Sequence, residues 1–355
     1  MNSKNRIGLA CLLFLVCVSS NASRVDANQL AQSNGPGYDV AINESHAFVT
    51  NNDGVAVYDI QNPSEPDRLG QIVLGGEARG IEVIGDILYT AGLSRGLIIA
   101  DISENPVNPI ILTEYTLSDY VSEVCIYGDY AYLSSGFGEF QILDISNPST
   151  PIGLGHLSIS ELTLGIAVSG STVYIAQPNS GMRLIDVSDL NSPYTFSLVS
   201  GTSGARELYV QGDLLYVARG TSGVSIFDIS DSSNPLPLGQ YNDGGNSFGV
   251  HGDSQYLLIA DLEQGVELLD ISDPETPVEV AQYDDAAPHN LIYNNGYAYL
   301  ADQDDEFQII YFGSSFSTTA TGQSDNSLQV MSTIFPIAGV CAVAVFILIV
   351  LKRRS

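Results

Sequence analysis

"FQILDISNP", residues 140–148, is one of six closely related phrases in this chain, each of which ends a β-like run with Asp and then Ile or Val. The six Asp residues are Asp59, Asp101, Asp144, Asp186, Asp228 and Asp270. They are 42, 43, 42, 42 and 42 positions apart, and a further step of 41 reaches Tyr311 in "FQIIYFGSS" (307–315), where the Asp is lost. This period predicts seven units of nearly constant length.

Each unit holds four short runs that are typical of β-strands. In the second unit they are "RGIEVIG" (79–85), "DILYTAG" (86–92), "GLIIADIS" (96–103) and "NPVNPIILTEY" (105–115). Val, Ile, Leu and Tyr are divided by Gly, Asn, Asp and Pro, and no helical period is found between 37 and 312. Four strands in about 42 residues, repeated seven times, predict an all-β, seven-bladed β-propeller. A linear solenoid is disfavoured because the ends carry no distinct polar caps.

Two stretches carry a family resemblance. "LLYVARGTSGVSIFDISDSSNP" (214–235) and "YAYLSSGFGEFQILDISNPSTP" (130–151) resemble the repeat of the LVIVD-repeat family of bacterial and archaeal proteins. The WD40 class is not indicated, since its Trp-Asp signature is missing and the chain has no Trp. The resemblance covers about 37–312 and implies a propeller in an exported or surface protein. It implies no agreed activity, and it offers no catalytic residues to transfer.

The beginning of the chain has the design of a secretory signal. Lys4 and Arg6 precede an apolar run from Ile7 to Val18, and the small polar residues "SSNAS" follow. This pattern predicts a signal peptide over 1–22 with cleavage after Ala22, because the run is too short to span a membrane. The propeller is then expected over 23–312.

The end of the chain predicts a membrane anchor. A Ser/Thr-rich stalk is expected over 313–332, a transmembrane helix over 333–351 and a basic tail over 352–355. The uncharged run from Ile334 to Leu351 spans ~27 Å as a helix, close to the thickness of a bilayer core. Positive residues stay in the cytoplasm, so we expect a single-pass protein of the cell membrane with its propeller outside. A cleaved sorting signal of the same design stays open.

The middle of the chain is strongly acidic. Residues 28–330 contain 6 Arg and no Lys against 40 Asp and Glu, a formal net charge of −34. Nucleic acid is excluded as a partner, because its phosphates would be repelled. A solvated surface, bound divalent cations, cationic partners and life in high salt all fit this charge. Of the four Cys only Cys125 falls in the exported part, so an intrachain disulfide is not expected there.

The broken phrase at 307–315 predicts how the ring closes. The last unit has no D-I-S-N-P turn and therefore no fourth strand of its own. Upstream of the first unit, "LAQ" (30–32) resembles the fourth-strand "VAQ" (280–282) and lies at nearly the same distance before the next inner strand. We expect residues 24–33 to pair with the last blade, 289–312, which removes an exposed sheet edge.

The repeated Asp has two interpretations. A ring of six carboxylates is one way to bind metal. Alternatively, the Asp and Ser of the D-I-S-N/D-P phrase fix a turn through hydrogen bonds from side chain to backbone. A feature found in almost every unit is more readily explained as part of the scaffold, so the second interpretation is preferred.

The position just before each innermost strand varies from unit to unit and indicates a site at the channel mouth. The candidate ligand-binding residues there are Tyr38, Asp39, Arg79, Glu123, Arg206, Glu207, Phe248, His289 and Asn290. Arginine forks can grip a carboxylate or sugar hydroxyls, and Tyr38 and Phe248 are expected to offer stacking faces. The alternative is that Arg–Glu pairs only fasten neighbouring blades to one another.

An acidic loop in the last unit is a candidate calcium site. Asp302, Asp304, Asp305 and Glu306 offer the hard oxygen ligands that Ca²⁺ prefers. The spacing fits no EF-hand, and a solvated acidic loop explains the same residues.

No catalytic motif is present: the sequence contains no G-x-S-x-G elbow, no H-E-x-x-H and no P-loop. We therefore expect a non-enzymatic cell-surface binding or adhesion module that engages an extracellular protein or carbohydrate at the channel mouth. Two alternatives stay open. One is a propeller hydrolase or lyase with a channel active site, with or without a metal. The other is a structural component of the cell envelope.

Overall fold

The computed structural model describes residues 23–25, 35–117 and 120–313. The chain divides into two units, Met1–Ser315 and Phe316–Ser355, and the second lies wholly outside the described residues. The predicted signal peptide, the stalk after Gly313, the transmembrane helix and the basic tail therefore remain predictions. The described part of the chain contains no helix with the length and apolar character needed to cross a bilayer.

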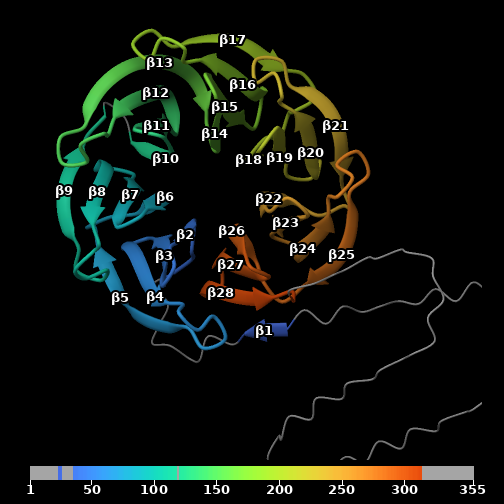
Figure 1. The fold of residues 1–355 in the computed structure, drawn as a ribbon, viewed down its shortest axis with the longest axis horizontal. Coiled ribbons are helices and arrows are strands. Elements are labelled where there is room, and N and C mark those ends of the chain that lie inside the picture. The colour runs from blue at the N-terminus through green and yellow to red at the C-terminus, as the bar shows by residue number, and fades with distance from the viewer. Residues whose placement is uncertain (1–22, 26–34, 118–119, 314–355) are drawn as a thin grey trace, which may run out of the picture. The chain divides into compact units, whose positions relative to one another are not determined.

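All regular structure in the described residues is β, arranged as seven four-stranded sheets around a central axis (Figure 1). Blade 1 holds β2 (Val40–Ile42), β3 (His46–Asn51), β4 (Gly54–Asp59) and β5 (Asp67–Val73). Blade 2 holds β6 (Ala78–Ile84), β7 (Ile87–Gly92), β8 (Gly96–Asp101) and β9 (Ile110–Tyr115). Blade 3 holds β10 (Val121–Tyr127), β11 (Tyr130–Ser135), β12 (Phe137–Asp144) and β13 (Ile152–Leu162). The predicted seven-bladed propeller is confirmed.

The remaining blades repeat this plan, each beginning with its innermost strand. Blade 4 holds β14 (Ile166–Ser169), β15 (Thr172–Gln177), β16 (Gly181–Asp186) and β17 (Tyr194–Val199). Blade 5 holds β18 (Glu207–Gln211), β19 (Leu214–Ala218), β20 (Val224–Asp228) and β21 (Leu236–Tyr241). Blade 6 holds β22 (Ser247–Gly252), β23 (Tyr256–Asp261), β24 (Gly265–Asp270) and β25 (Val278–Tyr283). Blade 7 holds β26 (Pro288–Asn294), β27 (Tyr297–Asp302), β28 (Glu306–Tyr311) and β1 (Ser23–Val25).

The core lies between neighbouring blades. Between blades 1 and 2, for example, Phe48 and Val57 belong to the same buried cluster as Leu88 and Ile98. The second and third strands of each blade are buried on both faces, as expected for sheets covered on either side by another sheet. Each blade therefore needs both neighbours, and the closed ring supplies them.

Strand β1 closes the ring on the outer edge of blade 7 (Figure 1). It pairs antiparallel with β28, with Ser23 opposite Tyr311 and Val25 opposite Ile309. An N-terminal closing strand was expected, and residues 23–25 confirm it. The rest of the predicted segment, including "LAQ" at 30–32, lies outside the described residues. The loss of the D-I-S-N-P turn in the last repeat is explained, since its fourth strand comes from the other end of the chain.

The repeated Asp residues act as turn formers. In Asp144 the Oδ1 atom accepts hydrogen bonds from the backbone N of Ser146 at 2.9 Å and from its hydroxyl at 2.7 Å. Asp101, Asp186 and Asp270 repeat both bonds with the Ser two positions on, and Asp59 and Asp228 accept the corresponding backbone bond. The preferred interpretation, that these Asp residues belong to the scaffold, is confirmed.

Candidate functional site

The central channel is lined by the first strand of each blade and contains two cavities. The mouth pocket, of about 450 Å³, lies where the first strands begin. The lower chamber, of about 380 Å³, lies further along the same strands. Asp39, Glu123, Glu207 and Asn290 line both cavities and so form the constriction between them, here called the inner ring.

All nine predicted site residues line the mouth pocket. The pocket is also lined by residues that the sequence argument had not selected: Leu93, Tyr120, Ser122, Gly136, Leu162, Thr163 and Leu164. These come mainly from blades 3 and 4 and give that side of the mouth a largely neutral wall. That the nine residues bind a ligand stays a prediction, but their convergence on one cavity is a fact of the fold.

Irregular strand pairing at the start of the inner strands explains why two consecutive residues can face the channel. A register shift occurs between Val121 and Glu123 in β10. Similar shifts occur at the starts of β6, β22 and β26. A regular strand points successive side chains to opposite faces, whereas a bulge turns an extra side chain toward the same side. Four blades can therefore present pairs such as His289 and Asn290 to the mouth pocket.

The rim of the mouth pocket carries a continuous arc of aromatic rings and guanidinium groups. The Arg79 Cζ atom lies 3.8 Å from the centre of the Tyr38 ring, and the Arg206 Cζ atom lies 4.0 Å from the centre of the Phe248 ring. Between the two pairs, the His289 ring is 5.8 Å from Tyr38 and 6.1 Å from Phe248. Cation–π attraction holds both guanidinium groups over ring faces. The expected stacking surfaces of Tyr38 and Phe248 are thus already covered on one face.

The two rim arginines differ in their partners. Arg79 forms an ion pair with Glu77, two residues earlier in its own blade. Arg206 makes no side-chain hydrogen bond or ion pair within the described residues, and burial lowers its pKa. Neither arginine pairs with Asp39, Glu123 or Glu207. The alternative in which Arg–Glu pairs at these positions fasten blades together is therefore not what the structure shows.

His289 is set up as a neutral hydrogen-bond acceptor. Its Nδ1 atom lies 2.9 Å from the carbonyl oxygen of Gly37, so Nδ1 carries the proton and donates it. Burial and the nearby Arg79 guanidinium lower the pKa of the imidazole. The Nε2 atom then keeps its lone pair.

Acidic residues and glycines alternate around the inner ring. Gly80, Gly165 and Gly249 occupy the inner-ring position in blades 2, 4 and 6, between Asp39, Glu123, Glu207 and Asn290. A Cβ atom at Gly249 would lie 2.6 Å from Asn290 Oδ1, and one at Gly80 would collide with the Glu123 carboxylate. The glycines therefore leave room for the longer side chains of the following blade.

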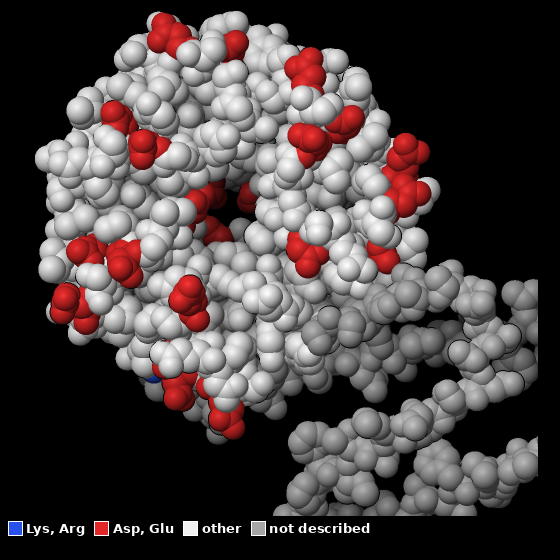
Figure 2. Space-filling model, viewed as in Figure 1, with Lys and Arg blue, Asp and Glu red and all other residues white. Residues whose placement is uncertain are grey.

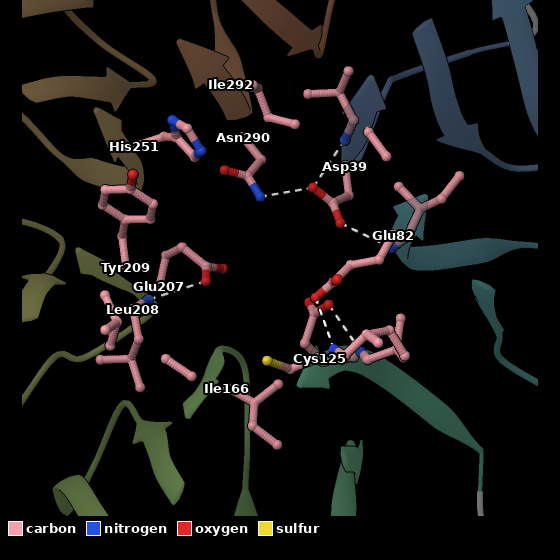
Figure 3. A pocket seen from close by; sticks show the side chains of 18 of the residues that line it. Asp39, Glu82, Cys125, Ile166, Glu207, Leu208, Tyr209, His251, Asn290 and Ile292 are labelled. Atoms are coloured by element: carbon pink, nitrogen blue, oxygen red, sulfur yellow. Dashed lines mark hydrogen bonds between the residues drawn. The ribbon is translucent and has the colours of Figure 1, made fainter. Parts of the chain in front are cut away.

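The inner-ring carboxylates are held mainly by backbone N–H groups. Asp39 accepts from Val40 N at 2.8 Å, from Ile81 N at 2.9 Å and from Asn290 Nδ2 at 2.7 Å (Figure 3). Glu123 and Glu207 each accept one bond through Oε1, at 3.0 Å, from the N of the next residue. Asp39 is thus fully engaged, whereas the two glutamates keep an oxygen free of protein partners in the described structure.

Burial in the channel raises the pKa of every inner-ring carboxyl group. The pKa of Asp39 rises to about 6 and that of Glu207 to about 8, with Asp39 adding repulsion at Glu207. The pKa of Glu123 is also well above its usual range, because burial is joined by repulsion from Asp39, Glu207 and Glu82. At neutral pH these groups can hold protons that surface carboxylates have lost.

The lower chamber contains titratable residues that the sequence argument missed (Figure 3). Glu82 Oε1 accepts from Ile126 N at 3.0 Å, and burial raises the pKa of Glu82 to about 8. The His251 ring lies 4.3 Å from that of Tyr209, and burial lowers the His251 pKa to about 4. Burial also raises the pKa of the Cys125 thiol. Each is two residues beyond an inner-ring position, so the two-residue period of the strand was the signal that could have found them.

The candidate calcium loop is occupied by protein contacts. Asp302 is fully buried and accepts from the backbone N of Asp304, Asp305 and Ala287. Glu306 is also fully buried and accepts from Asn51 Nδ2 and the Tyr58 hydroxyl, both at 2.7 Å. In the parts of the chain that the structure describes, no group of three or more His, Cys, Asp or Glu is placed to hold a metal ion. These two carboxylates instead fix a turn and join blade 7 to blade 1.

The repeats identify the family. Seven segments match the LVIVD repeat: 34–72, 75–116, 119–157, 163–199, 203–243, 244–285 and 290–310. The chain belongs to the LVIVD repeat family. The segments coincide closely with the seven blades, so each LVIVD repeat corresponds to about one blade. Among curated proteins, none matches the chain.

Solved structures agree on the fold. The β-propeller domain of Cps50 (Swd1) from Myceliophteria thermophila is 12% identical, with a TM-score of 0.64 over 82% of this chain and 100% of that one. The computationally designed Ika8 protein is also 12% identical, with a TM-score of 0.60 over 78% of this chain and 83% of that one. At this identity the likeness shows the fold alone.

Proposed function

We propose that this LVIVD propeller is a ligand-binding module and that its ligand enters the mouth pocket and contacts Arg206. The proposal joins the geometry of the pocket to the topology expected from the sequence, in which the propeller stands outside the cell on a membrane anchor. Pockets of this volume are common in small-molecule sites. The lack of a recognised catalytic motif favours binding over turnover.

The observation that carries the proposal is the unpaired state of Arg206. The six arginines between residues 35 and 313 otherwise have polar protein partners. These are Glu306 for Arg68, Glu77 for Arg79, Glu114 for Arg95, Gln177 for Arg183, and the carbonyls of Gly201 and Ser222 for Arg219. Only Arg206 among them lacks such a partner in the described part of the chain, and it lies on the mouth pocket. The Arg206 guanidinium therefore has N–H donors that a ligand oxygen in the pocket can accept from.

The covered ring faces narrow the ligand chemistry. A sugar would stack on exposed aromatic faces, but guanidinium groups already lie over Tyr38 and Phe248. A carboxylate, in contrast, meets the donors of Arg206 directly. Between the expected partner classes, the rim therefore favours a ligand with an acidic group, such as an extracellular protein or peptide, over a neutral carbohydrate.

The test is a ligand screen on matched variants. Amino acids, short peptides, sugars and organic acids are added to the propeller, and thermal shifts are measured for the wild type, Arg206→Gln and Arg95→Gln. Arg95 pairs with Glu114 and lines neither cavity, so it controls for the loss of one positive charge. We expect at least one compound to stabilise the wild type and Arg95→Gln but not Arg206→Gln. Stabilisation that survives in Arg206→Gln would reject the mouth pocket as the site.

One observation favours a second candidate function, a hydrolase or lyase. Glu207, whose pKa is raised to about 8 by burial, lines the mouth pocket. Such a group is suited to general acid catalysis. Turnover of nitrophenyl glycosides or esters that is lost in Glu207→Gln, with binding retained, would favour an enzyme.

A further inference from the structure

The mouth pocket has guanidinium groups at one pole and carboxyl groups at the other, and together they define the ligand more narrowly than the proposed function does. Arg206 and Arg79 lie on its rim, whereas Glu123 and Glu207 lie on its floor. All four residues line one cavity, so a single small molecule can meet both poles. The inference below rests on the proposed function, because it concerns the same pocket.

The positive pole is centred on Arg206. Its guanidinium lies over Phe248 and has no polar partner among the described residues, while Arg79 is already neutralised by Glu77. The rim therefore offers one guanidinium group, that of Arg206, whose N–H donors are not used by described protein residues. A carboxylate is its planar, two-pronged complement.

The negative pole is centred on Glu123 and Glu207. Each glutamate uses Oε1 to accept a backbone N–H, and its Oε2 has no protein partner within the described residues. Gly165 of blade 4 stands between them in the ring, and a Cβ atom there would lie 3.1 Å from Glu207 Oε1. The missing side chain leaves room beside the Glu207 carboxyl group. An ammonium group placed between the Glu123 and Glu207 carboxylates would receive two acceptors and relieve the repulsion between them.

The remaining wall is uncharged and includes three leucines. Leu93 of blade 2, Leu162 of blade 3 and Leu164, just before blade 4, line the mouth pocket. An apolar side chain of a ligand would be removed from water by contact with these leucines.

We propose that the mouth pocket binds a small zwitterion of the amino-acid type, a free apolar amino acid or a short apolar peptide. Its carboxylate meets Arg206, its ammonium group meets Glu123 and Glu207, and its side chain contacts the leucine wall. A ligand of this kind neutralises both poles at once. A dianion such as phosphate is repelled by the acidic floor, a simple amine leaves Arg206 unpaired, and a neutral sugar leaves both poles without a counter-charge.

Ligands whose ammonium group is acetylated, or whose carboxylate is converted to an amide, test the two poles separately. These two modifications are called caps. The probes are L-leucine, N-acetyl-L-leucine, L-leucinamide and N-acetyl-L-leucinamide, with L-leucyl-L-leucine and its capped forms as a longer series. Binding is measured by titration calorimetry at pH 8. We expect the uncapped forms of at least one series to bind, and each cap to weaken binding by about 30-fold or more, the cost of leaving a buried charge unpaired.

Protein variants test which residues are responsible for the effect of each cap. Arg206→Gln should weaken the uncapped ligand about as much as amidation does, and it should leave the affinity of the amide unchanged. Glu123→Gln with Glu207→Gln should reproduce the effect of N-acetylation in the same way. Arg95→Gln, which lies outside both cavities, should bind like the wild type.

The outcomes separate this inference from the proposed function. If the doubly capped ligand binds as tightly as the free one, or if neither uncapped series binds, the zwitterion is wrong. In that case a different compound whose stabilising effect requires Arg206 would still support the proposed function. If Arg206→Gln changes the affinity of none of the compounds that bind, both proposals fail together.

Discussion

Carboxylates at the outer turns and carboxylates in the channel behave in opposite ways. The outer set, defined as Asp101, Asp144, Asp186 and Asp228, accepts hydrogen bonds from the Ser two residues on, and these bonds lower its pKa values. The inner ring carries Asp39, Glu123 and Glu207, whose pKa values are raised, first by burial. Both sets are repeated around the same axis.

The contrast distinguishes residues that are repeated because they hold the fold from residues that vary and so can form a site. At the outer turns every blade needs the same bend, so the same Asp recurs and its charge is stabilised locally. At the inner ring the blades differ: acids stand in blades 1, 3 and 5, glycines in blades 2, 4 and 6, and Asn290 in blade 7. In Figure 2, acidic side chains form separate patches on the visible face around the ring and also appear inside the central opening.

The largest expected effect comes from closing a gap in the inner ring. In Gly165→Ala the new Cβ would lie 2.7 Å from the Arg206 carbonyl oxygen and 2.9 Å from Glu207 Cα, both of which are backbone atoms. We expect a loss of about 2–3 kcal/mol in the free energy of unfolding, the usual cost of overpacking. Denaturant unfolding measures it. Gly76→Ala is the control, because its nearest atom would be Ser94 Oγ at 3.7 Å, and it should change stability little.

A smaller effect separates the two sets by pH. Glu82, in the lower chamber, has a folded pKa of about 8 against a reference value of 4.5. Its protonated form favours the folded state, so this contribution is complete below pH 4.5 and is lost as the pH rises through 8. Glu82→Gln removes the penalty and should stabilise the protein at pH 8 by about 1–2 kcal/mol, after allowance for screening by channel water. It should have almost no effect at pH 4.

The outer set should show the reverse pH dependence. The folded pKa of Asp228 is depressed, so its contribution to stability is present above its unfolded pKa and is lost as the pH falls through the folded value. Asp228→Asn should therefore be slightly destabilising at pH 8 and neutral at the acid end. Unfolding curves for Glu82→Gln and Asp228→Asn at pH 4 and pH 8 provide the test. If the change in stability has the same pH dependence in both variants, the contrast is wrong.

Ligand binding should depend on pH through the inner ring. An ammonium group needs ionised carboxylates, so binding of L-leucine or L-leucyl-L-leucine should release protons and tighten about tenfold between pH 6 and pH 8. Calorimetry in buffers of different ionisation enthalpy measures the protons released. Affinity that is constant over this range would show that the ligand does not meet the inner ring.

The smallest effect is expected at a single outer turn. Ser146→Ala removes the hydroxyl that donates to Asp144 at 2.7 Å but keeps the backbone bond at 2.9 Å. We expect a slight decrease in melting temperature, similar to that of Ser188→Ala in blade 4, whose bonds to Asp186 are of the same kind. Unequal effects in the two blades would mean that the turns are not equivalent scaffold.

The fold could be predicted from the sequence because the same pattern occurs in seven units. The Asp spacing, the four runs in each unit and the broken last phrase together predicted the blades and an N-terminal closing strand. Residue 23 as the start of that strand was not predictable, because "LAQ" at 30–32 offered a more regular match to the fourth-strand pattern. The short β1 depends instead on backbone pairing with β28, which has no side-chain signature.

The position of the site was predictable, but the partners that its side chains contact were not. Aligning inner strands placed nine residues around one pocket, since equivalent positions in a closed ring must meet at the axis. That Arg79 pairs with Glu77 and Arg206 with no described residue depends on rotamers that the sequence does not reveal. The contacts of the acidic loop were not predictable for a similar reason: Glu306 has φ of 64° and accepts hydrogen bonds from Asn51 and Tyr58 of blade 1.

The central claim is that the inner ring, and not the overall acidity, recognises the ligand. It is tested most directly by two double variants that each replace two acidic residues by their amides, Glu123→Gln with Glu207→Gln, and Asp144→Asn with Asp228→Asn. The affinity of each for the tighter-binding of L-leucine and L-leucyl-L-leucine is measured by calorimetry at pH 8. We predict that the inner pair loses about 30-fold or more, the cost of an unpaired ammonium group, while the outer pair stays within about twofold of the wild type. Equal changes in the two variants would contradict the account, because binding would then follow net charge alone.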